Sequence, residues 1–173
     1  MSKPNKKNNR NNINNKKEFS RTIWHIASIV YILIIIKLII FKYPVSRLYH
    51  IMQSWGSESI RMGIKSANFE PFKTIQMYIR YYGSLNSFEN LFGNILVFIP
   101  FGFLIPHALP KMRNILWLLI FSGFFITDIE LFQLVTRFGE FDVDDIILNV
   151  IGVVLGFMVF HIFYFLKRLI KKH

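Results

Sequence analysis

The chain has 173 residues, of which 53% are hydrophobic and 17% aromatic, and its mean hydropathy is +0.37. This composition is too apolar for a soluble domain of this length and indicates an integral membrane protein. The net charge of +11 is also typical of nucleic-acid binders, but thirteen of the 21 Lys and Arg residues lie before Trp24, at Lys111 and Arg113, and after Leu166. Basic segments on one side of apolar spans follow the positive-inside rule, so we expect no nucleic-acid partner. Cysteine is absent, which excludes disulfides, thiolate metal ligands and a cysteine nucleophile.

The chain begins with a polar segment and then an apolar one. Residues 1 to 18 hold seven Asn and six Lys or Arg with almost no apolar side chain, so they cannot bury enough surface to order themselves. We therefore expect residues 1–22 to form a disordered, basic cytoplasmic tail. Residues 23–41 are an apolar run of bilayer-spanning length, with Trp24 and Tyr43 as interfacial anchors. Lys37 lies four residues from its end, where the side chain can reach the headgroups.

The segment from 42 to 89 is too polar to span a membrane. Its aromatic residues are interleaved with Lys and Arg, and apolar side chains recur at helical spacing, as at Leu48, Met52 and Trp55 or at Ile75, Ile79 and Tyr82. Two interpretations remain open for this outer loop. It forms either short amphipathic helices on the outer membrane interface or a loop packed over the bundle.

Three further apolar runs predict spans over residues 90–109, 115–135 and 145–166. Pro100 lacks a backbone N–H and should bend or break the first of these, which a bilayer tolerates only where protein surrounds the helix or a cavity adjoins it. Basic residues follow in the turn 110–114 and in the cytoplasmic tail 167–173. Four spans put both basic termini on one side. The predicted fold class is therefore an all-α membrane protein with four transmembrane helices, an outer amphipathic loop, and N and C termini in the cytoplasm.

Polar side chains interrupt the last two spans in a regular pattern. Glu130, Gln133 and Arg137 fall at i, i+3 and i+7, and the same spacing continues after the turn through Asp142, Asp145, Asn149, Gly152 and Gly156. Each set occupies one helix face, and the short connection makes the helices antiparallel, so the two faces should oppose each other. Asn90 and Asn94 begin the second span, and a rise of ~1.5 Å per residue places Asn94 level with Glu130 and Asn149. The spacing of Gly152 and Gly156 is typical of close helix packing.

These side chains fit more than one role. An ionisable group inside a bilayer is costly, so Glu130 is a functional candidate. The competing interpretation is a structural network, in which Glu130 and Gln133 bond to Asn94 and Asn149 while Arg137 pairs with Asp142 or Asp145. Oxygen ligands at these positions would also suit Mg²⁺ or Ca²⁺, and Glu130, Asp142 and Asp145 are the candidates for acid–base catalysis. No nucleophile or cofactor motif accompanies them, so we predict neither a cofactor nor a bound metal.

The order and spacing of these motifs resemble the VanZ-like family of small bacterial membrane proteins. The residues that carry the resemblance are Asn68, Pro71, Phe72 and Thr74; Asn90-Leu-Phe-Gly-Asn94; the run from Phe98 to Pro106; Glu130 and Gln133; and Arg137 with Phe141-Asp-Val-Asp-Asp145, Asn149, Gly152 and Gly156. The similarity covers about residues 25–166, within a domain expected over 23–166. Two positions depart from the family pattern: Ile126 stands where a hydroxyl residue is frequent, and Asp128 is an additional intramembrane acid.

The resemblance implies a multi-pass protein of the bacterial cell membrane with a role in low-level resistance to the glycopeptide teicoplanin. We expect a non-enzymatic protein whose partners are membrane lipids and either a lipid-linked cell-wall precursor or the lipid-tailed antibiotic. The predicted binding residues, beneath the outer loop, are Asn90, Asn94, Glu130, Gln133, Arg137, Asp142, Asp145 and Asn149. The alternative is an intramembrane enzyme or small transporter that uses the acids Glu130, Asp142 and Asp145.

The charge bias and the number of spans predict the topology independently. Reporters fused after His173 or near Met112 should be cytoplasmic, and a reporter near Asn68 should be external. Paired alkaline phosphatase and green fluorescent protein fusions measure this directly. An internal reporter at Asn68 would contradict the predicted orientation and the depth assigned to Glu130.

Overall fold

The computed structural model describes residues 6–40, 45–53, 55–81 and 85–170. Its elements are α1 (Lys6–Ile40), α2 (Val45–Gln53), α3 (Ser57–Ser66), α4 (Lys73–Arg80), α5 (Leu85–Ala108), the 3₁₀ turn η1 (Pro110–Arg113), α6 (Ile115–Thr136) and α7 (Val143–Ile170). These ranges contain no strand, only one isolated bridge between Asn68 and Asp142. The predicted all-α fold is confirmed. Tyr43, expected as an interfacial anchor, lies outside the described residues.

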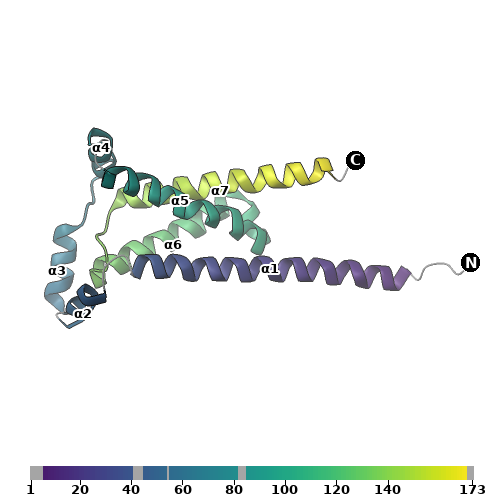
Figure 1. The fold of residues 1–173 in the computed structure, drawn as a ribbon, viewed down its shortest axis with the longest axis horizontal. Coiled ribbons are helices and arrows are strands. Elements are labelled where there is room, and N and C mark those ends of the chain that lie inside the picture. Colours follow the sequence, from purple (N-terminus) through teal and green to yellow (C-terminus); the bar gives the residue numbers. More distant parts are fainter. Residues whose placement is uncertain (1–5, 41–44, 54, 82–84, 171–173) are drawn as a thin grey trace, which may run out of the picture.

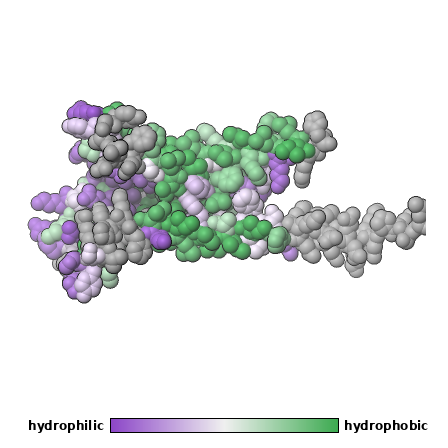
Figure 2. Space-filling view, in the orientation of Figure 1, coloured by the Kyte–Doolittle hydropathy of each residue, from purple (hydrophilic) through white to green (hydrophobic). Residues whose placement is uncertain are grey.

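Four helices contain stretches that are long and apolar enough to cross a membrane. These stretches are Glu18–Leu38, Asn90–Ala108, Ile115–Thr136 and Val143–Ile170, which confirms the number and order of the predicted spans. On the face seen in Figure 2, apolar side chains form a band across the middle of the molecule, and polar side chains gather at the end that holds the short helices. The chain is therefore a multi-pass membrane protein, because only contact with lipid accounts for so much exposed apolar surface.

Successive spans run antiparallel, and α5 packs against α1, α6 and α7 (Figure 1). The short helices α2–α4 gather with residues 137–142 at one end of the bundle, here called the loop end. The opposite end, here called the basic end, holds the start of the first span, η1 and the last turns of α7. At the loop end, α3 packs on α6, and α4 packs on α5 and α7. The outer segment thus contains short helices and also covers the bundle, which combines both interpretations left open above.

The helix α5 runs unbroken through Pro100 and Pro106. Side chains of two other elements, α1 and η1, bond to backbone carbonyl groups of this helix. The Tyr31 hydroxyl of α1 donates to the carbonyl of Val97, and Arg113 Nε donates to the carbonyl of Pro106 at 3.2 Å. The expectation that this proline-containing span lies inside the bundle is confirmed, since it packs on the other three spans.

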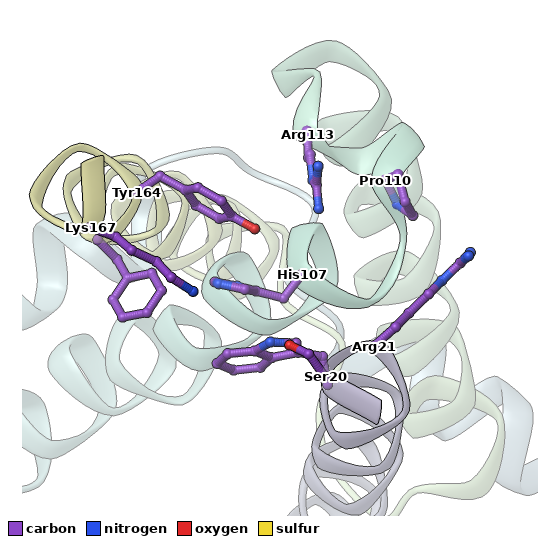
Figure 3. Close-up of a pocket in the computed structure, with 9 residues that line it drawn as sticks. Ser20, Arg21, His107, Pro110, Arg113, Tyr164 and Lys167 are labelled. Carbon is purple, nitrogen blue, oxygen red and sulfur yellow. The ribbon is translucent and has the colours of Figure 1, made fainter. Parts of the chain in front are cut away.

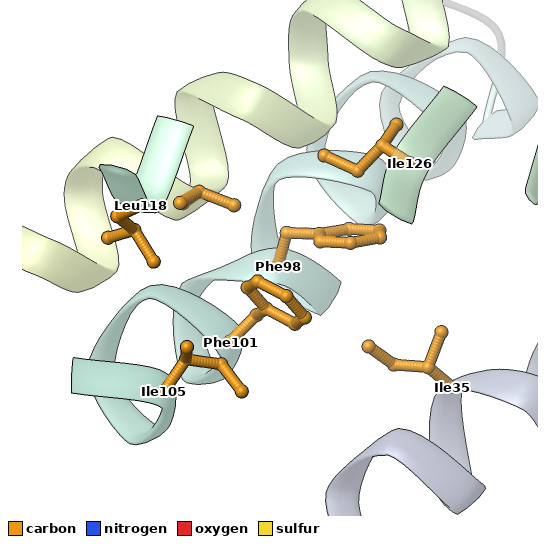
Figure 4. Close-up of a cluster of buried hydrophobic side chains, with 7 residues drawn as sticks. Ile35, Phe98, Phe101, Ile105, Leu118 and Ile126 are labelled. Atoms are coloured by element: carbon orange, nitrogen blue, oxygen red, sulfur yellow. The ribbon is translucent and has the colours of Figure 1, made fainter. Parts of the chain in front are cut away.

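A hydrophobic core fills the space between the four spans (Figure 4). It consists of Ile35, Phe98, Phe101, Ile105, Leu118, Ile126 and Val153. Phe101 lies at its centre, fully buried, with ring centroids 5.2 Å from Phe125 and 6.1 Å from Phe121. Ile126 is also fully buried in this core. Where a hydroxyl residue is frequent in the family pattern, Ile126 therefore contributes an apolar side chain to the core.

Glycines allow the backbones of α5 and α7 to touch. A Cβ atom added to Gly152 or Gly156 would overlap the carbonyl oxygen of Ile95 or Ile99, and one added to Gly102 would overlap the carbonyl oxygen of Val153. This confirms the close packing face predicted from the Gly152 and Gly156 spacing. The contact fixes the relative height of the polar residues on the two helices.

The structure differs from the sequence prediction at the start of the chain. Residues 6–22 continue the helix of the first span, where a disordered tail was expected. Propagating an existing helix adds one hydrogen bond per residue without a new nucleation step, so a polar segment can extend a helix that it could not start. Residues 1–5 and 171–173 of the two predicted tails lie outside the described residues.

Gly152→Leu and Gly156→Leu should separate α5 from α7, because each places a side chain against a backbone carbonyl. We expect a destabilisation of about 1–3 kcal/mol or more, seen as a lower Tm and less monodisperse protein after detergent extraction. Gly123→Leu is the matched control, since a Cβ there meets nothing within 4 Å. Equal stability of all three variants would show that the glycine face does not hold the bundle together.

Candidate functional site

The buried carboxylate of Asp144 fastens the outer segment to the start of α7. Its side chain is fully buried. One oxygen accepts the backbone N–H of Phe72 at 2.5 Å, and the other accepts those of Thr74 and Ile75 at 2.7 and 3.1 Å. These N–H groups belong to the N-terminus of α4, where the helix dipole and unpaired donors stabilise a negative charge. Three charge-assisted hydrogen bonds thus offset the cost of burying the carboxylate.

Asn68 and Asp142 complete this arrangement, here called the loop clasp (residues 68–75 and 141–144). The backbone of Asn68 pairs with Phe141 and Val143 at 2.8 and 3.1 Å. Its side-chain amide donates to Asp142 Oδ1 at 2.8 Å and to Thr74 Oγ1 at 3.0 Å. Asp142 Oδ1 also accepts the N–H of Asp144 at 2.8 Å, which caps the first turn of α7. Asp142, predicted as a binding residue, is therefore engaged within the clasp.

Asp144 was missed by the search for a single polar helix face. That search followed i, i+3 and i+7 from Asp142, and Asp144 falls outside the series. Two signals were present in the sequence: the Asn68 to Thr74 motif of the outer loop, and the absence of an N-capping side chain before α4, where Phe72 stands. Phe72 adopts a left-handed backbone conformation, with a φ of 68°. Its own N–H and those of Thr74 and Ile75 bond to the Asp144 carboxylate.

Beneath the clasp lies a cavity of about 250 Å³ that all four spans line. Its polar residues are Asn90, Asn94, Glu130, Gln133, Asp145 and Asn149, and its apolar residues include Ile35, Leu38, Val97, Phe98 and Ile129. The structure thus gathers six of the eight predicted binding residues in this polar cavity. The predicted common level of Asn94, Glu130 and Asn149 agrees with this arrangement.

Of the polar side chains that line the cavity, those of Glu130, Gln133 and Asn149 are buried, while the others are half-buried or exposed. Glu130 is 3% exposed, and its Oε2 accepts the N–H of Asp142 at 3.2 Å. Asn94 Nδ2 donates to Asp145 Oδ1 at 2.5 Å. Asn149 is 5% exposed, and its Oδ1 has no hydrogen-bond partner within the described part of the chain. A buried acceptor without a partner is costly, so this oxygen can accept a hydrogen bond from a ligand in the cavity.

Tyr78 of α4 contacts one of the residues that line the polar cavity. Its side chain hydrogen-bonds Asn90. Burial raises the pKa of Tyr78 above its usual value of 10.0, and the negative charges of Asp145 and Asp142 raise the pKa further. The phenol therefore stays neutral at physiological pH and keeps its proton as a hydrogen-bond donor. The outer segment is thus linked to the cavity residue Asn90 through Tyr78.

The predicted pairing of Arg137 with Asp142 or Asp145 is wrong. Among the described residues, Arg137 forms no ion pair. It ends α6 with a left-handed φ of 60°, and its N–H donates to the carbonyl of Gln133. The two aspartates already accept hydrogen bonds, Asp142 from Asn68 and the α7 backbone and Asp145 from Asn94. Arg137 is thus part of the connection between helices, outside the polar cavity.

The cation-site hypothesis and the additional acid Asp128 remain to be placed. In the residues that the structure describes, no three His, Asp or Glu side chains converge on one point, so the cation-site hypothesis receives no support from this geometry. Asp128 is exposed on α6, about 200° around the helix from Glu130. Its position on the outside of the bundle separates it from the polar network.

Asp144→Asn should loosen the clasp, because an amide retains one acceptor oxygen and turns an N–H₂ toward backbone donors. We expect faster hydrogen exchange at Phe72, Thr74 and Ile75 and a loss of about 1.5–3 kcal/mol in the local opening free energy. Glu140→Gln, which changes an exposed acid in the neighbouring connection, is the control. Unchanged exchange in the Asp144 variant would show that the clasp does not depend on this carboxylate.

Comparison with known sequences agrees with this architecture. A family model described as VanZ/LLP1 matches residues 28–164, which include parts of all four spans, the clasp and the polar cavity. No curated protein and no solved structure matches the chain. The match covers well over half of the sequence. The chain belongs to the VanZ/LLP1 family, the VanZ-like family that its motifs resemble.

Proposed function

We propose that this protein lowers the susceptibility of the bacterial cell envelope to lipid-tailed glycopeptide antibiotics such as teicoplanin by binding an amphiphile, without catalysing a reaction. The observation that carries the proposal is the mixed lining of the polar cavity. Aliphatic side chains of α1, α5 and α6 line this cavity together with amide and carboxyl side chains of α5, α6 and α7. Such a lining matches a ligand with an acyl chain and a polar group.

The orientation of the protein is part of the proposal. Thirteen of the 21 Lys and Arg residues lie in the three segments at the basic end, and the positive-inside rule assigns that end to the cytoplasm. The loop clasp and the polar cavity then face the outer leaflet. Both candidate ligands, a lipid-linked cell-wall precursor and the acyl tail of the antibiotic, are met at that leaflet.

Apolar and polar side chains of the cavity would contact different parts of the ligand. The acyl chain packs against Ile35, Leu38 and Val97, which are apolar side chains of the cavity lining. The polar group of the ligand meets Asn149 Oδ1, which lacks a protein partner, and the neutral Tyr78 hydroxyl lies on the loop side. Binding here would withdraw the antibiotic's tail from the lipid that anchors it, or shield the precursor that it recognises.

A second candidate function is an intramembrane enzyme or small transporter. The observation that favours it is the presence of the carboxyl groups of Glu130 and Asp145 on the same cavity. Ionisable groups at membrane depth commonly serve proton or ion pathways. This alternative requires at least one of the two groups to change its protonation state, whereas amphiphile binding does not.

Filling the cavity tests the binding proposal. Gly93 lines the cavity, and a Cβ there meets nothing within 4 Å, so Gly93→Leu should occupy the ligand's space without disturbing the bundle. In a deletion strain, the variant should fail to restore protection against teicoplanin, while Gly123→Leu, also in open space, restores it. A glycopeptide without an acyl tail should show little difference between strains. Full protection by Gly93→Leu at normal protein level would contradict the proposal.

Charge replacements separate the two candidate functions. Glu130→Gln and Asp145→Asn keep shape and hydrogen-bonding capacity but remove ionisation, whereas Glu130→Leu removes both. If the groups only hold an amphiphile or join helices, the amide variants protect and Glu130→Leu lowers the amount of folded protein. If ionisation is needed, both amide variants lose protection with unchanged Tm, and Asp128→Asn, outside the cavity, retains it. That second pattern would favour the enzyme or transporter.

A further inference from the structure

A second hollow lies at the basic end, separate from the polar cavity. It measures about 220 Å³ and is lined by side chains of α1, α5, η1 and α7, among them Arg21, Trp24, His107, Arg113, Tyr164 and Lys167 (Figure 3). We call it the basic pocket. None of these residues contributes to the polar cavity, so the proposed function leaves this hollow unexplained.

The basic pocket holds positive charge without a counter-ion. Arg21, Arg113 and Lys167 come from three different elements, and in the described ranges none of them forms an ion pair. The positive-inside rule explains why cations lie at this end of the bundle. It does not explain why three of them surround one hollow, since mutual repulsion favours their separation. An anion in the hollow would remove that repulsion.

His107 has an unused hydrogen-bonding atom at this pocket. The residue is 5% exposed, and its Nδ1 lies 2.8 Å from the carbonyl oxygen of Phe103. A carbonyl oxygen only accepts, so Nδ1 carries the proton. The other nitrogen, Nε2, is buried and has no partner among the described residues. A neighbouring anion would favour the imidazolium form, in which Nε2 also donates.

The surrounding side chains are arranged around this nitrogen. Trp24 stacks on the imidazole at a centroid distance of 4.0 Å, and the Tyr164 ring lies 5.4 Å away. Figure 3 shows Arg113, Tyr164 and Lys167 turned toward His107, while the Arg21 side chain extends away from it. Because Arg113 uses Nε to bind the Pro106 carbonyl, its two terminal amino groups are available for a bidentate contact with an anion.

We propose that the basic pocket binds a phosphate group, supplied by the headgroup of an anionic membrane lipid. Arg113, Lys167 and the His107 imidazolium would donate to the phosphate oxygens. Apolar side chains beside the pocket favour a lipid, because Phe163 lines it and the exposed Ile23 and Leu166 continue into the apolar band. Basic pockets between transmembrane helices are suited to lipid phosphates in this way.

The bound headgroup would link α1 and α7, which are otherwise connected through α5. Both α1 and α7 pack on α5, and both supply side chains to the pocket. A phosphate bonded to η1 and α7 and facing α1 would therefore hold the basic end of the bundle together. This inference does not depend on the proposed function, and its failure would leave the polar cavity untouched.

Trp24 provides the measurement, because it lines the pocket. In a Trp55→Phe, Trp117→Phe background Trp24 is the one tryptophan left of three. The full chain is reconstituted in phosphatidylcholine vesicles containing either brominated phosphatidylglycerol or brominated phosphatidylcholine at equal mole fraction. We expect stronger quenching by the anionic lipid. Lys167→Gln and Arg21→Gln should each lower the relative affinity about fivefold, the effect of one charge at a membrane surface.

Lys111→Gln is the matched control. It removes a charge at the same end of the bundle, but from a side chain that does not line the pocket. Its relative lipid affinity should stay near that of the unmodified chain. Equal losses in Lys111→Gln and Lys167→Gln would show general surface attraction and would overturn the assigned site.

A second arm separates the sources of phosphate. Inorganic phosphate is added to the protein in vesicles of phosphatidylcholine alone, and Trp24 emission is recorded. A preference for brominated phosphatidylglycerol identifies a lipid ligand, whereas a saturable response to inorganic phosphate without that preference identifies a soluble one at the same pocket. Equal quenching by both lipids together with no response to phosphate would overturn the proposal. This comparison uses intact pocket residues, so it stands even where a variant fails to fold.

Discussion

The buried carboxylate of Asp144 determines how the outer segment meets the membrane bundle. Its three backbone donors all come from residues 72–75, so the charge is stable only while α4 is held in place. The reverse also applies, because the N-terminus of α4 has no capping side chain of its own. This mutual dependence also positions Tyr78 of α4, which hydrogen-bonds the cavity residue Asn90. Asp142, through Asn68 and the first turn of α7, connects the same clasp to the span that carries Asp145 and Asn149.

Close contact between α5 and α7 sets the geometry beneath the clasp. In a bilayer, helices gain little from excluding lipid, so association depends on packing and hydrogen bonds. Gly102, Gly152 and Gly156 supply the packing by letting backbones touch, and the bond between Asn94 and Asp145 supplies the polar contact about two to three turns away. The cavity remains open because Gly93 places no side chain in it.

Charge is distributed unevenly along the bundle. Carboxyl and amide groups line the cavity near the loop end, while unpaired cations and a buried histidine line the pocket at the basic end. The two hollows therefore suit different parts of lipid-like molecules. The ligand proposed for the polar cavity has an acyl chain and hydrogen-bonding groups, whereas the ligand proposed for the basic pocket has a phosphate group. Membership of the VanZ/LLP1 family is relevant to the proposal for the polar cavity and assigns no ligand to the basic pocket.

The sequence by itself determined the four spans, the glycine face and the shared level of Asn94, Glu130 and Asn149, because hydropathy and helical periodicity depend on residues close along the chain. The tertiary structure decided which polar groups meet. Asp144 binds residues about 70 positions away in the chain, a contact that helical periodicity does not predict. Asp142 and Asp145, the expected partners of Arg137, are instead hydrogen-bonded to Asn68 and Asn94. The basic pocket likewise needs four separate elements brought to one place. Hydrogen bonds and charges act over a few ångströms in space, and only the packed bundle defines that distance.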